Sequence, residues 1–332
     1  MNSPTQNNSY ARVADEMLVD TVDRFFAEHS TPERIHAAEG SMDRALFAAS
    51  VEMGLTSIGV AESLGGSGGT LHDAAAVMYA TGYHAVAAPV ADVLATALIG
   101  AVHGMSPVEG VTVALTGKRV PWWGVVDRVL WADGSAAAVS LDVVSTGVNY
   151  AGEPFGVVES REKLAFADDI LALTRAAQMA GALQRVSELS VQYSVEREQF
   201  GKPIGKQQIL QHYLAQMAGD AAAARGAVDN AVDVWSVSGP GSWFTLAVAA
   251  AKTVSGRMVS VTNRNAHQLH GAIGFTDEHR LQYWTRRLWA WRDDFGTEVH
   301  WAAVLGRSLV SDGGRSLWPF VTSLPPALDS PT

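Results

Sequence analysis

The stretch EREQFGKPIGKQQILQHYLAQMA, residues 196–218, interrupts a long run of helical periodicity and decides how the sequence divides. Arg197 falls in the last turn of the preceding helix, where a cation faces the negative end of the helix dipole. Gly201 suits the position just after a helix, and Pro203 follows the stop. The stretch therefore predicts two long helices joined by a short connection.

The same connection carries side chains that helix ends do not require. Arg197, Gln199 and Phe200 lie at the turn, and Gln207 and Gln208 open the next helix. Together they supply a guanidinium group for phosphate, a ring for stacking and amides for hydrogen bonds. This combination suits a nucleotide diphosphate.

Hydrophobic periodicity on both sides of this stretch predicts a mainly α fold in three parts. Residues 12–107 read as an N-terminal α-helical domain. Residues 108–164 contain short Val-rich runs and read as a small, truncated middle β domain. Residues 165–310 read as a C-terminal helical bundle. We expect a disordered N-terminus over residues 1–11 and a flexible tail over residues 311–332.

Composition excludes several classes of function. The formal net charge of −10 argues against binding to nucleic acid or to an anionic membrane surface. The absence of cysteine excludes disulfides, thiolate nucleophiles and cysteine-ligated metals. The most apolar window, residues 90–102, contains Asp92 and is shorter than the roughly 20 residues that cross a bilayer. Without a signal-peptide pattern at the N-terminus, we expect a cytoplasmic protein.

Other motifs carry little chemistry. LGGSGGT at residues 64–70 resembles a phosphate loop but lacks the Gly-Lys-Thr ending and a βαβ context, so we interpret it as a connector between helices. His267 and His270 share a helix face without a third ligand nearby, and we expect no metal site. Trp284, Leu288 and Trp291 form a stripe that is typical of a helix facing the core.

Two motifs together resemble a known family. REQFGKPIGKQQILQHYLAQMA, with QLHGAIGFTDEHRLQYWTRRL at residues 268–288, is similar to the C-terminal helical domain of the acyl-CoA dehydrogenases. The helical, β, helical order matches that family, and the resemblance extends from Arg12 to Leu309. It implies an acyl-CoA dehydrogenase-like fold and FAD as cofactor. In the family a carboxylate removes the pro-R α-proton of an acyl-CoA thioester, the β-hydride goes to N5 of FAD, and an electron-transfer flavoprotein accepts the electrons.

The resemblance also implies a set of cofactor contacts. In the family, the Arg-x-x-Phe-Gly turn and the Gln-x-x-Gly segment contact the adenosine diphosphate half of an FAD that a neighbouring subunit mainly holds. By resemblance these contacts fall on Arg197, Gln199, Phe200, Gln208, Gln268 and Gly271.

The family's catalytic base is not found where the resemblance places it. The usual base is the Glu of a Tyr-Glu-Gly-Thr turn, and in DDFGT, residues 293–297, that position is Phe295. Some relatives place the base on the first bundle helix, and the matching positions near Leu171 and Ala172 carry no Glu. A phenyl ring cannot accept a proton, and loss of a general base typically costs about 10²–10⁴ in rate. The family's Gly-Ser-Asp and ITNG-like segments are also missing from the middle domain.

One branch of the family has this character. Heteromeric, α2β2-type acyl-CoA dehydrogenases desaturate steroid side-chain CoA thioesters in bacterial sterol and cholesterol catabolism, and only one of their subunits carries the catalytic Glu. The sequence is similar to the degenerate subunit. This resemblance implies a catalytic partner subunit, an FAD shared with it, an acyl-CoA substrate and an electron-transfer flavoprotein.

Two alternatives stay open. The chain could be a self-sufficient homo-oligomeric flavoenzyme with its base relocated to Asp294 or Glu298. Against this, Asp294 has the position of a helix N-cap and Glu298 that of a first-turn acid, and both roles are structural. The other alternative is a non-catalytic scaffold that binds no flavin.

Overall fold

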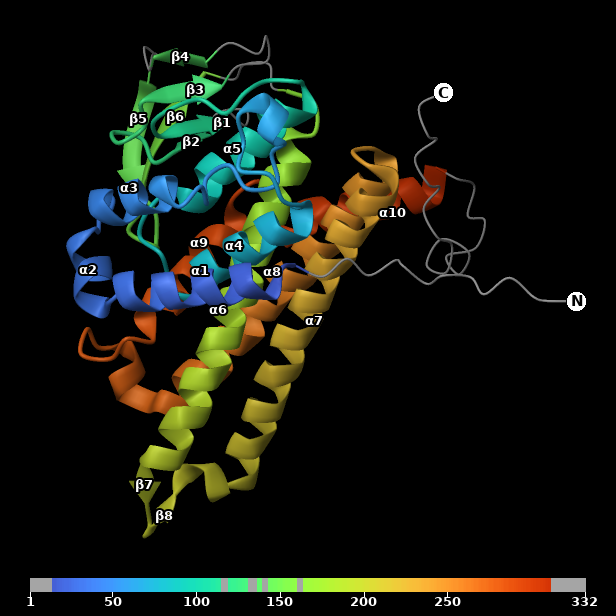
Figure 1. The fold of residues 1–332 in the computed structure, drawn as a ribbon. Coiled ribbons are helices and arrows are strands. Elements are labelled where there is room, and N and C mark those ends of the chain that lie inside the picture. The colour runs from blue at the N-terminus through green and yellow to red at the C-terminus, as the bar shows by residue number, and fades with distance from the viewer. Residues whose placement is uncertain (1–13, 115–118, 131–135, 139–142, 160–163, 312–332) are drawn as a thin grey trace, which may run out of the picture.

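The computed structural model describes residues 14–114, 119–130, 136–138, 143–159 and 164–311 (Figure 1). Most of the segments expected to be disordered or flexible, residues 1–11 and 311–332, therefore lie outside the described residues. Helices precede and follow a small β region, so the predicted mainly α fold class is confirmed. The exact limits of the three parts stay predictions.

The N-terminal part contains five α-helices and one 3₁₀-helix. They are α1 (Glu16–His29), α2 (Pro32–Ala37), α3 (Arg44–Glu52), η1 (Glu62–Leu64), α4 (Leu71–Tyr83) and α5 (Val90–Val102). The side chain of the N-cap residue Thr70 accepts a hydrogen bond from Asp73 N–H, and Asp73 caps Thr70 N–H in return. Helix α5 is buried from Val90 to Gly100, which explains its continuous apolar sequence.

The described residues of the β region form two three-stranded sheets. Its strands are β1 (Thr112–Ala114), β2 (Arg119–Pro121), β3 (Arg128–Leu130), β4 (Ala136–Ala138), β5 (Val143–Val148) and β6 (Pro154–Val158). The strand orders are β1-β3-β4 and β2-β6-β5; β1 and β3 pair in parallel and the other pairs are antiparallel. Val113, Val120, Val129 and Val158 form a small core of their own between the sheets.

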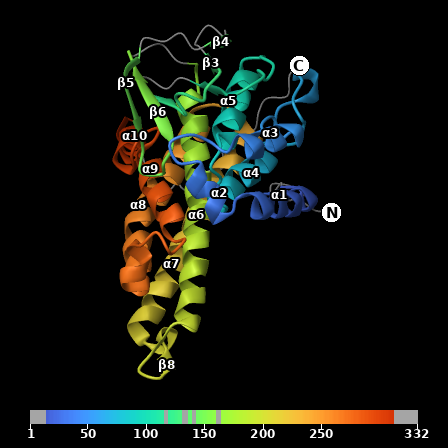
Figure 2. The ribbon, with the colours of Figure 1, turned by 90° about the vertical axis from the view of Figure 1, so that its left-hand side faces the viewer.

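The C-terminal part is a bundle built on three long helices. Its elements are α6 (Ala167–Glu196), β7 (Glu198–Gln199), β8 (Lys202–Pro203), η2 (Ile204–Lys206), α7 (Gln208–Ser238), α8 (Ser242–His270), η3 (Gly271–Phe275), α9 (Gln282–Asp293) and α10 (Glu298–Ser311). The β7–β8 hairpin and the two sheets lie at opposite ends of α6 (Figures 1 and 2). No helix among the described residues is long and apolar enough to span a membrane.

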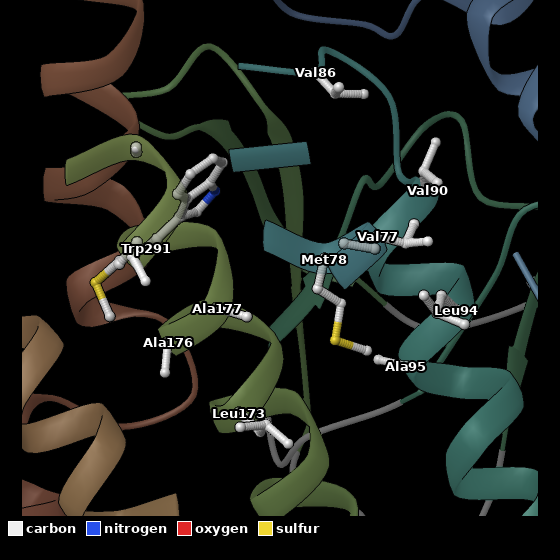
Figure 3. Packing of buried hydrophobic residues seen from close by; sticks show 14 of the residues in the cluster. Val77, Met78, Val86, Val90, Leu94, Ala95, Leu173, Ala176, Ala177 and Trp291 are labelled. Atoms are coloured by element: carbon white, nitrogen blue, oxygen red, sulfur yellow. The ribbon is translucent and has the colours of Figure 1, made fainter. Parts of the chain in front are cut away.

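Glycines allow α4 and α6 to pack in backbone contact. A Cβ atom on Gly82 would lie 2.0 Å from the carbonyl oxygen of Gln178, and one on Gly181 would lie 2.1 Å from that of Tyr79. Such distances are impossible for a real side chain. Because the backbones touch, Met78 of α4 reaches α6, where its sulfur lies within hydrogen-bond distance, 3.5 Å, of Thr174 Oγ1. Figure 3 shows Met78 on the side of α6 that carries Leu173 and Ala177.

The stripe predicted to face the core does so: Trp284, Leu288 and Trp291 are all buried. The prediction for Gly201 was wrong. Helix α6 ends at Glu196, and Gly201 is instead the second residue of the two-residue turn of the β7–β8 hairpin. Phe200 and Gly201 both have positive φ, 54° and 74°, which is the backbone of a type I′ turn.

Candidate cofactor surface and base-position cavity

The six predicted cofactor residues gather at the hairpin end of the bundle, and we call them the distal surface: Arg197, Gln199, Phe200, Gln208, Gln268 and Gly271. Four come from the end of α6, the hairpin and the start of α7. The other two lie at the end of α8, and the ring of Tyr193 on α6 stacks on that of His270 on α8 with 4.5 Å between centroids. The structure therefore brings these two groups of residues, 60 to 74 positions apart in sequence, to the same end of the fold.

All six residues of the distal surface are exposed. Phe200 is 97% exposed, which is unusual for an aromatic ring. Within the described part of the chain, no carboxylate pairs with the Arg197 guanidinium group, and no hydrogen bond engages the side chains of Gln199, Gln208 or Gln268. The surface thus offers unpaired donors and a free ring to an external ligand.

Exposed apolar side chains accompany the distal surface. Val191 and Val195 lie near the end of α6, Ile209 at the start of α7, and Ile273 and Phe275 in η3; all are more than one-third exposed. We call these five residues the apolar rim. Large apolar residues that gather in one region of a surface commonly mark a contact with another macromolecule.

The turn that follows α9 lies on the other side of the molecule, toward the sheets. Phe295 and Gly296 have φ values of 54° and 93°. A Cβ on Gly296 would lie 2.6 Å from Nε1 of Trp301, so only glycine fits there. The same Trp301 Nε1 donates to the carbonyl oxygen of Phe295 at 2.9 Å, which fixes the turn against α10.

Lys252 on α8 fixes this turn through hydrogen bonds to backbone carbonyl groups. It is fully buried, and its Nζ donates to the carbonyl oxygens of Trp291, Arg292 and Gly296 at 3.1, 2.8 and 2.8 Å. The lysine thereby satisfies carbonyl groups at the end of α9 that have no partner inside the helix. Burial lowers the pKa of Lys252 to about 7, although nearby Asp294 opposes the shift.

A cavity of about 240 Å³ opens beside Phe295. Its lining comprises Arg119, Pro121, Trp122, Asn149, Glu153, Pro154, Phe155, Arg175, Asp293, Asp294, Phe295 and Gly296. The centroid of the Phe295 ring lies 5.0 Å from the guanidinium carbon of Arg175. The cavity therefore lies where the β region, the bundle and the turn after α9 meet.

A chain of ion pairs crosses this region; Arg175, Asp92 and Asp294 are buried, and the Arg119 side chain is 37% exposed. Arg175 Nη2 donates to Asp92 Oδ1 at 2.8 Å, and Arg175 Nε donates to Asp294 Oδ2 at 3.3 Å. The second oxygen of Asp294 lies 2.9 Å from Arg119 Nη1. Burial acts against the charged guanidinium group, but Asp92, Asp294 and Glu153 together raise the pKa of Arg175. The arginine is therefore charged at every accessible pH.

The interpretation of Asp294 as an N-cap was wrong. Asp294 closes α9, and its carboxylate is only 6% exposed because it lies between two arginines. The residue before α10 is Thr297, whose hydroxyl accepts from His300 N–H. Glu298 is a first-turn acid of α10, as predicted, and is not part of the cavity lining.

Sequence reasoning missed Glu153. It lies in the turn between β5 and β6, where its carboxylate accepts from Asn149 Nδ2 at 3.0 Å and Trp291 Nε1 at 3.2 Å. Burial raises the pKa of Glu153, even though Arg175 opposes the shift. The only sequence signal was the turn itself, because contact with α9 depends on the tertiary fold.

No carboxylate replaces the base on the first bundle helix. Leu171 and Ala172 are buried. Thr174, the residue directly before Arg175, donates its hydroxyl proton to the carbonyl oxygen of Ile170. Because Arg175 and Arg197 are separated by 22 residues of helix, about 33 Å at 1.5 Å per residue, the cavity and the distal surface are far apart.

Two family models match the chain: "Acyl-CoA dehydrogenase, N-terminal domain" over residues 13–104 and "Acyl-CoA dehydrogenase, C-terminal domain" over residues 169–304. Among curated proteins, acyl-CoA dehydrogenase IpdE2 of Mycolicibacterium smegmatis is 28% identical over 298 residues, which cover 82% of this chain and 91% of IpdE2. The IpdE2 of Mycobacterium tuberculosis is 26% identical and covers 82% and 90%.

Solved structures show the same fold. The ChsE4-ChsE5 complex from Mycobacterium tuberculosis contains a chain with a TM-score of 0.74 and 20% identity, covering 91% of this chain and 98% of that one. The Tcur3481-Tcur3483 steroid ACAD gives a TM-score of 0.76 and 22% identity, covering 90% and 98%. These likenesses confirm the fold predicted from the two motifs.

Proposed function

Since this chain belongs to the acyl-CoA dehydrogenase family, whose members are oxidoreductases acting on CH–CH bonds, we propose that it is the non-catalytic subunit of a heteromeric member. In this proposal it completes the FAD site of a partner subunit that carries the catalytic Glu. It removes no proton itself.

The observation that carries this proposal is Phe295. The residue at the family's base position is a hydrocarbon ring beside a cavity, and the neighbouring carboxylate of Asp294 is engaged by Arg175 and Arg119. A carboxylate with both oxygens held by guanidinium groups is not placed to approach a substrate carbon. Proton removal must then come from another chain.

The distal surface fits the adenosine diphosphate part of FAD. Arg197 compensates phosphate charge, Phe200 offers an exposed ring for stacking, and Gln208 and Gln268 offer amides. FAD, when bound, supplies the hydride acceptor of the desaturation. The apolar rim supports a site shared with another subunit, because a solitary chain would leave it in water.

The cavity beside Phe295 does not fit a flavin. Its volume of about 240 Å³ is below the roughly 300–1,000 Å³ typical of small-molecule sites, and ion-paired side chains occupy much of its wall. These features of the described residues support a chain that lends part of a site and holds no flavin alone.

The substrate and partners follow from relatives. The two structures named above are complexes, and one is a steroid ACAD. We therefore propose an α2β2 assembly with a second acyl-CoA dehydrogenase subunit. Its substrate is a steroid side-chain CoA thioester of cholesterol catabolism, and an electron-transfer flavoprotein receives the electrons.

Co-expression with an acyl-CoA dehydrogenase subunit of the same organism that carries the catalytic Glu tests the proposal. The complex should contain one FAD for every two chains, and the chain purified alone should be colourless. Arg197→Ala in the complex should lower FAD retention at least tenfold, because a charge-assisted phosphate contact contributes about 1.5–3 kcal/mol. A yellow solitary chain that acyl-CoA reduces would contradict the proposal, and a complex without flavin would favour a scaffold.

One observation favours a self-sufficient enzyme as second candidate. Glu153 is a buried acid of raised pKa in the wall of the cavity beside Phe295, and such environments suit a general base. Against this role, both its oxygens already accept hydrogen bonds. Glu153→Gln removes the ionisable group and keeps one of the two acceptor oxygens. If Glu153 is not a base, the variant complex that retains a normal FAD content should turn over within about twofold of the parent; loss of turnover with normal FAD content would favour the second candidate.

A further inference from the structure

Three histidines lie directly behind the distal surface. His267 and His270 occupy the last turn of α8, where they alternate with Gln268 and Gly271. His279 lies in the connection between η3 and α9. None of the three serves the proposed function, which uses the exposed residues of the distal surface.

Ring contacts hold this cluster together. The His270 ring stacks on Tyr193 and makes an edge contact with His279 at 4.8 Å between centroids. The His267 ring stacks on Phe275 at 4.3 Å. Since Phe275 and His279 belong to the segment 271–280, these rings fasten that segment to α6 and α8.

The hydrogen bonds of His270 fix where its proton lies. Nδ1 is 2.8 Å from the carbonyl oxygen of Ala266, so Nδ1 carries the hydrogen and Nε2 does not. The ring is 3% exposed, and Nε2 is buried without a hydrogen-bond partner among the described residues. A second proton on Nε2 would create a buried cationic N–H with no acceptor.

The charges around the cluster do not compensate such a proton. His267, His279 and Arg280 are basic. The acids that face this region are Glu33 on α2, Glu196 on α6, and Asp277 and Glu278 in the connection. The carboxylate of Asp277 accepts a hydrogen bond from Gln282 Nε2, and the negative charge of Glu196 favours the charged form of Arg280. None accepts a hydrogen bond from an imidazole in the described chain.

Burial is also the main reason why the pKa of His270 falls to about 4, and burial lowers the pKa of His267 and His279 as well. The end of α8 favours a cation through its dipole, but this effect is smaller than the cost of burial. In the folded structure the three histidines therefore bind protons more weakly than they would if segment 271–280 detached and exposed them to water.

We infer that proton uptake by the cluster of His267, His270 and His279 releases segment 271–280 and so weakens the hold of the distal surface on its partner. The release is a property of this chain alone. The weakened hold rests on the proposed function.

The first experiment measures the release. Hydrogen exchange of the full chain, corrected for the intrinsic effect of pH, is recorded over residues 267–280 between pH 7.5 and 5. The opening constant should rise about 30-fold, which is the linkage expected for a group of pKa 6.5 when open and 4 when closed. His270→Phe keeps a stacking ring without a titrating nitrogen and should reduce the rise at least fivefold.

The matched control is His300→Gln, since His300 is exposed on α10, the helix that follows the Phe295 turn on the other side of the molecule. It should keep the full 30-fold rise. Equal pH dependence in the parent and His270→Phe would overturn the inference. So would a flat profile in the parent.

The second experiment uses the co-expressed complex. Its dissociation constant, measured by mass photometry at pH 7.5 and 5.5, should increase about tenfold for the parent and less than twofold for His270→Phe. If no complex forms at any pH, the proposed function fails while the exchange result still decides on the release. If the complex forms and both variants dissociate equally at low pH, the link to the distal surface is refuted.

Discussion

At the scale of the residue, Phe295 and Asp294 show that a residue's place in the sequence can be predicted when its burial and its contacts cannot. The resemblance located the DDFGT turn correctly, and Glu298 lies in the first turn of the helix that follows it, as predicted. Burial was not visible in the sequence. Asp is a residue type that often caps helices, yet the buried carboxylate of Asp294 forms ion pairs with Arg175 and Arg119.

Restoring a carboxylate at the base position should not restore an enzyme. We expect Phe295→Glu to give no acyl-CoA-dependent flavin reduction in the chain alone, because the cavity does not accommodate a flavin. The measurement is flavin absorbance after anaerobic addition of acyl-CoA. Appearance of a bound, reducible flavin in this variant would show that the chain needs only a base.

Lys252 should matter for stability through its three carbonyl acceptors. Lys252→Met leaves those carbonyls buried without a donor, and we expect unfolding free energy to fall by about 2–4 kcal/mol. Urea unfolding followed by circular dichroism measures the loss. The exposed Lys206→Met is the control and should change stability by less than about 0.5 kcal/mol.

At the scale of the element, periodicity predicted the long helices well because their buried faces are set by local spacing. The hairpin at residues 198–203 was not predicted. A Phe-Gly pair in a type I′ turn is uncommon, since the first position usually takes Asn, Asp or Gly. The sequence therefore indicated a helix end, whereas pairing of β7 with β8 decided the conformation.

The contact of Gly82 and Gly181 predicts a sharp difference between helical glycines. Gly181→Ala would place a methyl group inside the backbone of α4, and we expect a loss of at least 3 kcal/mol or failure to fold. Gly219→Ala on α7 meets nothing within 4 Å and should gain about 0.5–1 kcal/mol. Thermal unfolding of the two variants gives the comparison, and similar melting temperatures would refute the packing described.

At the scale of the whole molecule, the fold and the gathering of the distal surface followed from two motifs, because both lie at helix ends whose order fixes their place. The residues that line the cavity could not be predicted from these motifs. Glu153 and Arg119 of the cavity wall, and Asp92 that pairs with Arg175, come from three distant segments, and only tertiary packing brings their charges into one network.

Arg175→Leu should destabilise the whole chain. It leaves Asp92 buried without its partner, and we expect a loss of about 3–5 kcal/mol, since breaking a buried pair strands a charge. The exposed i,i+4 pair of Arg225 with Asp229 gives the control: Asp229→Asn should cost about 0.5 kcal/mol or less. Chemical unfolding at pH 7 measures both, and equal losses would contradict the burial of the network.

The ion-pair chain also determines what can be removed from this protein. A shortened version that begins at α6 would retain Arg175 and Asp294 but lose Asp92 and Arg119, so a guanidinium group and a carboxylate would each lose an opposite charge. The helical bundle is consequently not an autonomous module, and calorimetry of the intact chain should give one heat-absorption peak. The small sheets cannot be removed without cost, because β2 carries Arg119, which compensates the charge of Asp294.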